Sequence, residues 1–117
     1  MAKKKAKPEL KGNIWINTET GMIIGPGKAN LLQKIEETGS ISAAARSMKM
    51  SYRQAWYHIA TMNKNAGTAL VVKSTGGSGG GGAEITTEGK KLLKNYRAIN
   101  KRFHTFLQKE SKKLKIT

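Results

Sequence analysis

The stretch SISAAARSMKMSYRQAWYHIATMN, residues 40–63, decides the fold of this chain. Ser40 can cap a first short helix, which is rich in alanine and is expected to end near Lys49. Ser51 can cap a second helix, and Gln54 follows three residues later, the spacing of a capping box. Two short helices separated by about three residues predict a helix-turn-helix.

The second of these helices has one apolar face and one face that can form hydrogen bonds. Ala55, Ile59 and Met62 recur at helical spacing, so we expect them to point inward. At about 100° per residue, Arg53 and Tyr57 then point outward. Such a face suits contact with DNA, but it is also common on ordinary solvated helices. The helix pair alone therefore leaves both interpretations open.

The segment after the helix pair predicts a hairpin with a glycine-rich tip. Residues 70–73 read as a strand, residues 74–83 as a polar loop and residues 84–86 as the returning strand. Six of the ten loop residues are glycine, so this loop does not belong to the core. A flexible linker is the alternative, although strands flank the loop on both sides. As a wing, the loop could bring backbone N–H groups close to phosphates without obstruction by side chains.

The flanking segments predict a first hairpin, a first helix and a long terminal helix. Apolar runs at residues 14–16 and 22–24 form the hairpin signal, and a helix with one apolar side is expected over residues 28–38. Thr86 can cap the terminal helix, which is expected to begin at Thr87. The expected fold is therefore mostly α with small β hairpins (α+β).

Bulky apolar residues on the terminal helix recur at alternating spacings of four and three, as in a coiled coil. They are Leu92, Tyr96, Ile99, Phe103 and Phe106. We expect this seam to join two subunits, assisted by the apolar face at residues 31–35. Packing of the helix on its own domain is the alternative.

The chain has 117 residues and a formal charge of +15, from 22 Lys and Arg against 7 acidic residues. We expect a disordered basic arm over residues 1–11, one domain over residues 12–110 and a basic tail over residues 111–117. A polyanion is the natural partner, because basic side chains displace condensed counterions from phosphates. Membranes and acidic proteins attract the same side chains, so charge alone favours nucleic acid only modestly.

Several function classes are not expected from this composition. The chain has no Cys, all seven acidic residues are Glu, and His58 and His104 stand far apart without metal-ligand spacing. We therefore expect no enzymatic activity, no metal and no cofactor. No apolar run of about 18 residues and no secretory signal are present, so we expect no membrane partner and a cytoplasmic, nucleoid-associated protein.

Two runs of sequence carry a resemblance to a known family: GSISAAARSMKMSYRQAWYHIATMN, residues 39–63, and LVVKSTGGSGGGGAEITTEGKKLL, residues 70–93. They closely resemble the N-terminal DNA-binding domain of ModE-type molybdate-responsive regulators, which is related to the LysR helix-turn-helix. The most specific motifs are SY-x-x-AW at residues 51–56, the glycine run at residues 76–83 and IT-x-EG at residues 85–89. The resemblance covers about residues 12–100.

The resemblance implies a winged helix-turn-helix with a long C-terminal dimerisation helix. It also implies that the helix beginning at Ser51 enters the major groove and that the wing touches the DNA backbone. Family members that sense molybdate carry further C-terminal oxyanion-binding modules, for which a chain ending at Thr117 has no room, so no molybdate site is expected. Ser78 stands where the family commonly has a basic residue in the wing.

We therefore expect a sequence-specific DNA-binding transcriptional regulator that binds double-stranded DNA as a homodimer. The residues expected at the DNA are Ser51, Tyr52, Arg53, Gln54, Tyr57, Lys49, Lys64, Lys73, Gly76, Gly77 and Ser78. Arg53 is the expected base reader, because Arg near the start of a recognition helix can bind guanine O6 and N7 together. The lysines, with the arm at residues 3–7, would position the protein on phosphates.

Two other functions remain open from the sequence. The chain could be an interaction module that pairs with a full-length regulator. It could also be an architectural protein that coats DNA without sequence preference, for which its charge would suffice.

Overall fold

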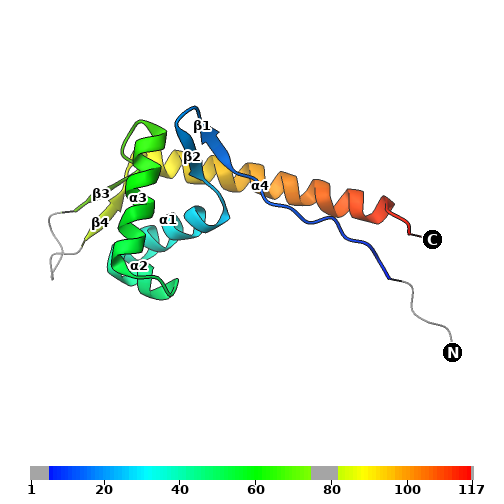
Figure 1. Cartoon of the computed structure of the whole chain (residues 1–117), viewed down its shortest axis with the longest axis horizontal. Helices are drawn as coiled ribbons and strands as arrows, with labels where there is room; N and C mark the ends of the chain where they lie inside the picture. The colour runs from blue at the N-terminus through cyan, green and yellow to red at the C-terminus, as the bar shows by residue number, and fades with distance from the viewer. Residues whose placement is uncertain (1–5, 75–81, 117) are drawn as a thin grey trace.

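The computed structural model describes residues 6–74 and 82–116, in which helices and two small hairpins follow one another (Figure 1). The elements are β1 (Ile16–Thr18), β2 (Gly21–Ile24), α1 (Pro26–Thr38), α2 (Ile41–Ser47), α3 (Tyr52–Ala66), β3 (Val71–Lys73), β4 (Ala83–Ile85) and α4 (Thr87–Lys113). Strands β1 and β2 form one antiparallel sheet, and strands β3 and β4 form a second one. The expected α+β architecture with a long C-terminal helix is confirmed.

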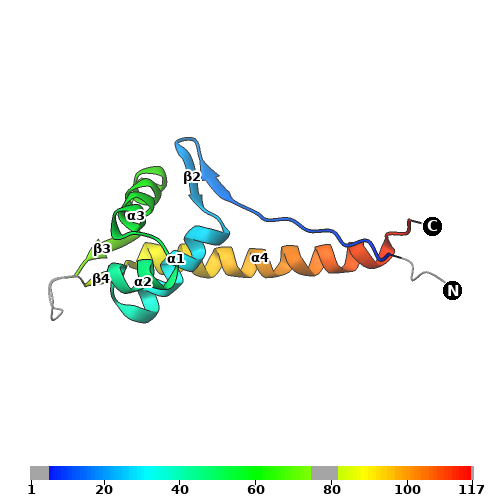
Figure 2. The same ribbon diagram turned by 60° about the horizontal axis from the view of Figure 1, so that its bottom comes forward.

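The molecule is elongated because α4 extends well beyond the other elements (Figures 1 and 2). Its principal extents are 65 × 34 × 20 Å. The β3–β4 hairpin points away from the C-terminal end of α4, so these two features lie at opposite ends of the long axis. The helices α1, α2 and α3 gather at the wing end, around the first part of α4.

The hydrophobic core lies where α1, α2 and α3 meet β2 and the first half of α4. Its most completely buried large side chains are Tyr96, Ile24, Leu31, Leu32, Ile35, Ile41, Ile59 and Met62. Burial of each aliphatic side chain of this size stabilises a fold by about 1.5–3 kcal/mol. Because Ile59 and Met62 belong to α3, this core holds α3 in place and leaves its opposite face to solvent.

The turn between α2 and α3 has the geometry that the helix-turn-helix pattern predicts. The Ser40 hydroxyl accepts a hydrogen bond from the Ala43 N–H and caps α2. Lys49 adopts φ 54°, a left-handed conformation that is uncommon outside glycine. The Met50 N–H donates to the carbonyl of Ala45, at 3.0 Å, and so folds the turn back onto α2. The predicted helix-turn-helix is confirmed.

Several element boundaries differ from the sequence prediction by one or two residues, among them the starts of α1 and β1. Helix α1 begins at Pro26 instead of residue 28, since proline suits the first helical turn, where its missing N–H is not needed. Strand β1 begins at Ile16, two residues later than expected. The carbonyl of Ile14 accepts a hydrogen bond from the Tyr96 hydroxyl, at 2.9 Å, and this contact lies outside the strand ladder.

The residues before β1 run beside the C-terminal half of α4 (Figures 1 and 2). The Leu10 N–H donates to the Ser111 hydroxyl, at 2.8 Å, and a Cβ at Gly12 would lie 3.2 Å from the Phe103 ring. Helix α4 itself continues to Lys113, into the expected basic tail. The part of the expected arm that is described, residues 6–11, contains no helix or strand.

The expected seam on α4 divides between the protein's own core and its surface. Tyr96 is buried, and Leu92 packs partly against the core, so neither stands free on a surface seam as the spacing suggested. Phe103 faces the segment before β1, whereas Ile99 and Phe106 are 42% and 56% exposed. The apolar face at residues 31–35 is also buried within the domain, which corrects its expected contribution to a subunit contact.

Candidate nucleic-acid interface

The outward face of α3 carries the polar residues that the sequence placed there. Tyr57 is 62% exposed and Tyr52 is 45% exposed, and Arg53 is also exposed. Ala55, Ile59 and Met62 are buried on the other face, as predicted. The helix therefore presents a continuous polar surface whose orientation is fixed from behind by the core.

Two of the expected site residues also hold the start of α3 in its helical form. The Ser51 hydroxyl accepts from the Gln54 N–H at 3.0 Å, and the Ser51 N–H donates to Gln54 Oε1 at 2.9 Å. This capping box satisfies two backbone N–H donors at once, those of Ser51 and Gln54. The carboxamide oxygen of Gln54 is thus committed to the cap, and only its NH₂ group is left for contact with a ligand.

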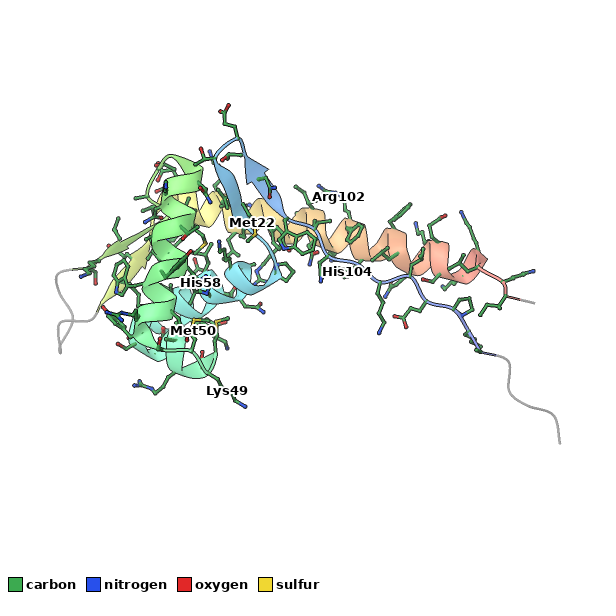
Figure 3. All side chains as sticks on the ribbon, in the orientation of Figure 1. Met22, Lys49, Met50, His58, Arg102 and His104 are labelled. Atoms are coloured by element: carbon green, nitrogen blue, oxygen red, sulfur yellow. The ribbon has the colours of Figure 1, made fainter. Side chains whose placement is uncertain are left out.

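Three exposed lysines lie around the outward face of α3 or at its end. Lys49 lies in the turn before α3 and extends away from the body of the protein (Figure 3). Lys64 lies in the last turn of α3. Lys73 ends strand β3, and its Nζ atom lies 5.0 Å from the centroid of the Trp56 ring. Basic groups therefore stand at both ends of α3 and beside it.

Trp56 joins α3 to the β3–β4 hairpin, a role that the sequence did not reveal. Its ring meets that of Tyr52 edge to face, with centroids 6.4 Å apart, and lies under the ammonium group of Lys73. Trp56 is half-buried and packs against the edge of the core. Tyr52, Trp56 and Lys73 thereby form one connected group across two elements.

The base of the hairpin is fixed by backbone hydrogen bonds. The Ala83 N–H donates to the Gly39 carbonyl at 2.9 Å, and the Thr86 N–H donates to the Leu70 carbonyl at 3.0 Å. Gly76, Gly77 and Ser78, which the sequence assigned to DNA contact, lie outside the described residues, as do Lys3, Lys4 and Lys5 of the arm. The first of these bonds ties the base of the wing to the C-cap of α1.

Two asparagines near the end of α3 were missed by the sequence analysis. Asn63 binds the backbone of residues 70 and 71, and the Asn65 Nδ2 atom donates to the Met22 carbonyl at 2.9 Å. The Thr18 hydroxyl in turn donates to the Asn65 carbonyl at 2.6 Å. Both hairpins are therefore tied to α3. The sequence pattern does not predict these contacts. The partner of Asn65 lies far away in sequence, and Asn63 reaches residues 70 and 71 only because the chain reverses direction after α3.

The charges around α3 are not balanced by neighbouring carboxylates. Among residues 6–74 and 82–116 there are two ion pairs, Lys34–Glu37 at 3.5 Å and Lys113–Glu110 at 3.0 Å, and neither involves α3. In that same part of the chain, no group of three or more His, Cys, Asp or Glu could hold a metal ion. No described helix is both long and apolar enough to cross a membrane.

Comparison with known proteins gives one match to a family model. Residues 28–90 match the bacterial regulatory helix-turn-helix protein, lysR family. This range runs from α1 through α2, α3 and both strands of the wing to the start of α4. The family match therefore covers the segment that carries the polar face of α3.

Curated relatives are similar over most of this chain. The chain is 38% identical to the transcriptional regulator ModE of Haemophilus influenzae over 82% of its own length and 39% of the relative's. It is 36% identical to the molybdenum transport protein ModE of Azotobacter vinelandii, over 85% of its own length and 37% of the relative's. The chain thus spans about two fifths of the length of these relatives.

Solved structures share the fold at lower sequence identity. The crystal structure of a CbnR_DBD–DNA complex matches with a TM-score of 0.58 and 19% identity, over 72% of this chain and 91% of that one. The LysR-type regulator LysG of Corynebacterium glutamicum matches with a TM-score of 0.52 and 22% identity, over 74% of this chain and 27% of that one. These likenesses establish the arrangement of helices and wing.

Proposed function

Because this chain belongs to the LysR family of bacterial regulatory helix-turn-helix proteins, we propose that it is a sequence-specific DNA-binding transcriptional regulator. The observation that carries the proposal is the exposed polar face of α3, which the buried face fixes and which basic groups surround. Similarity to regulators named ModE, and to a structure described as a DNA complex, supports it. Its site of action would be the nucleoid.

In this proposal α3 enters the major groove and reads base edges. Arg53 lies in the first turn of α3 and is exposed, so its guanidinium can reach guanine O6 and N7 together. Such a bidentate contact is worth about 1–3 kcal/mol of discrimination between bases. Tyr57, one turn further along the same face, supplies a hydroxyl and a ring edge.

The lysines around α3 take the phosphate contacts in this proposal. Lys49 and Lys73 stand beside the outward face of α3 and Lys64 stands at its end, where the phosphate backbones flank an inserted helix. Phosphate contacts fix the register of the protein on the duplex but carry no sequence information. Trp56 holds Lys73 at a set distance from α3, so the wing and the helix would approach the DNA as one rigid surface.

We also propose that the regulator acts as a homodimer. A single domain reads only a few base pairs, whereas two recognition helices about 34 Å apart read half-sites one helical turn from each other. On α4, Ile99 and Phe106 lie seven residues apart and are 42% and 56% exposed. This exposed pair supports helix pairing of the coiled-coil type. Tyr96 is instead buried in the core of its own chain, and the Phe103 ring lies against Gly12 in the segment before β1.

The proposal is tested by selecting bound duplexes from a random pool. A two-fold symmetric consensus is expected, and Arg53→Ala should flatten the preference at one position of each half-site. Lys64→Ala is the matched comparison: it should weaken all duplexes alike and reduce the salt slope by roughly 0.9. Uniform recovery of all sequences would instead indicate an architectural protein, and no recovery would indicate an interaction module.

A further inference from the structure

An open pocket of about 230 Å³ lies behind the DNA-facing surface, between β2, the start of α1, the turn before α3 and α3 itself. Its lining includes the side chains of Trp15, Met22, Lys28, Met48, Met50 and His58. None of these residues belongs to the proposed DNA contacts. The pocket therefore needs an explanation of its own.

Methionine is concentrated in this pocket. Residues 6–74 and 82–116 contain four methionines, and three of them, Met22, Met48 and Met50, line the pocket and are half-buried. They come from β2, from the C-cap of α2 and from the turn before α3. Met62, by contrast, is fully buried in the core. Met48 and Met50 pack partly against the core, and together with Met22 they also border the pocket.

An imidazole and an indole complete the lining. His58 lies on α3 and is half-buried, and Figure 3 shows it between Met22 and Met50. Trp15 is 57% exposed and lies against Gly25, where a Cβ would collide with the indole. The glycine thus allows the ring to lie close to the backbone at the pocket's edge. An indole face at that position attracts a cation.

We propose that this pocket binds one soft monovalent cation of the Cu(I) or Ag(I) class through the thioethers of Met22, Met48 and Met50 and the imidazole of His58. Thioether sulfur selects soft ions, and imidazole nitrogen also suits copper. The lining contains no carboxylate, so hard ions such as Mg²⁺ lack the oxygen ligands that they require. Methionine has three rotatable side-chain bonds, so its sulfur can turn toward an ion in the pocket.

The positive charge of Lys28 disfavours binding of a cation in this pocket, so replacing Lys28 tests the proposal. Lys28 is the charged side chain in the lining, and burial lowers the pKa of its ammonium group below the ordinary value. A protonated Lys28 repels a bound cation, so its removal should tighten binding. If the pocket instead suited an apolar or anionic molecule, removing the charge of Lys28 would leave the binding of that molecule unchanged or weaken it.

The experiment titrates silver nitrate into the whole chain in chloride-free buffer, without DNA, and follows heat release and thermal unfolding. One Ag⁺ per chain is expected, with a rise in Tm because the ion binds the folded form. Met48→Leu combined with Met50→Leu, and separately His58→Gln, should each weaken binding on the order of tenfold or more. Leucine conserves the volume of methionine, so the fold should be kept, as circular dichroism would check.

Matched control variants test whether Ag⁺ binds at this pocket. Met62→Leu removes a sulfur outside the pocket and His104→Gln removes the other histidine, so both should leave Ag⁺ affinity unchanged, while Lys28→Gln should raise it. Mg²⁺ at equal concentration should produce no shift in Tm. Absence of saturable Ag⁺ binding, or equal weakening by His104→Gln and His58→Gln, would overturn the proposal without touching the proposed regulator function.

Discussion

A hydrogen bond between Asn63 and Leu70 links α3 to the residue before strand β3 of the wing. Asn63 Oδ1 accepts a hydrogen bond from the Leu70 N–H at 2.8 Å, while its Nδ2 atom donates to the Val71 carbonyl at 3.3 Å. A single side chain on α3 therefore satisfies two backbone groups at the start of β3, in the way that a neighbouring strand would. The spacing between α3 and the wing depends on this contact.

Asn63→Ala should lower the free energy of unfolding by about 1–3 kcal/mol, because the N–H of buried Leu70 loses its partner. Urea denaturation measures the change. Asn17→Ala, at an exposed position of β1, is the control and should stay within about 0.5 kcal/mol of the unmodified protein. Equal values for the two variants would contradict the anchoring role of Asn63.

Gly89→Ala should destabilise the protein, because a Cβ there would collide with the Leu70 carbonyl and lie 2.8 Å from the Ile85 side chain. Overpacking of this kind costs about 1–3 kcal/mol. Gly27→Ala provides the comparison within α1, since a Cβ at that position meets nothing within 4 Å. There alanine should be neutral or stabilise by about 0.5–1 kcal/mol, as measured by the shift in urea midpoint.

Tyr96→Phe should change how stability depends on alkaline pH. Burial raises the pKa of Tyr96, and the charge of Arg97 partly offsets this effect. The folded form then holds the phenolic proton more tightly than the unfolded form, whose pKa is about 10. The stabilisation from the neutral hydroxyl is therefore complete below about pH 10 and is lost as pH rises through the folded pKa.

The Tyr96→Phe variant lacks this titration and loses the hydrogen bond to the Ile14 carbonyl, 2.9 Å long. Its stability at pH 7 should fall by about 0.5–1.5 kcal/mol, and the difference from the unmodified protein should shrink above pH 10. Urea unfolding at pH 7, 9 and 11 measures both effects. A constant difference over this range would show that Tyr96 does not titrate differently in the two states.

Ile99→Glu should give monomers in sedimentation while leaving the fold intact. Ile99 is 42% exposed in the single chain, so a charge there is solvated unless a second α4 covers it. In a dimer the same charge would be desolvated and unpaired, at a cost of several kcal/mol. Arg97→Gln lowers the net charge of the same helix by one unit, as Ile99→Glu does by adding a carboxylate, and should not dissociate the dimer. If the unmodified chain already sediments as a monomer at micromolar concentration, the dimer proposal fails.

The sequence by itself determined the elements whose signals are local. Ser51 and Gln54 predicted a capping box that the structure contains, and Thr86 predicted the start of α4. The inward positions Ala55, Ile59 and Met62 followed from the helical period alone. Such features depend on residues within a turn or two of each other, so the chain specifies them before any distant contact forms.

Only the tertiary structure decided what covers each apolar surface. The spacing of Tyr96, Ile99 and Phe106 is the same whether the helix faces a partner or its own chain. Tyr96 is buried in the core, with its hydroxyl bonded to the carbonyl of Ile14, far away in sequence, while Ile99 remains exposed. In the same way, Met22 and His58 line one pocket only after β2 and α3 pack together. A period along one helix records which residues share a face, and the long-range packing of the chain determines what that face meets.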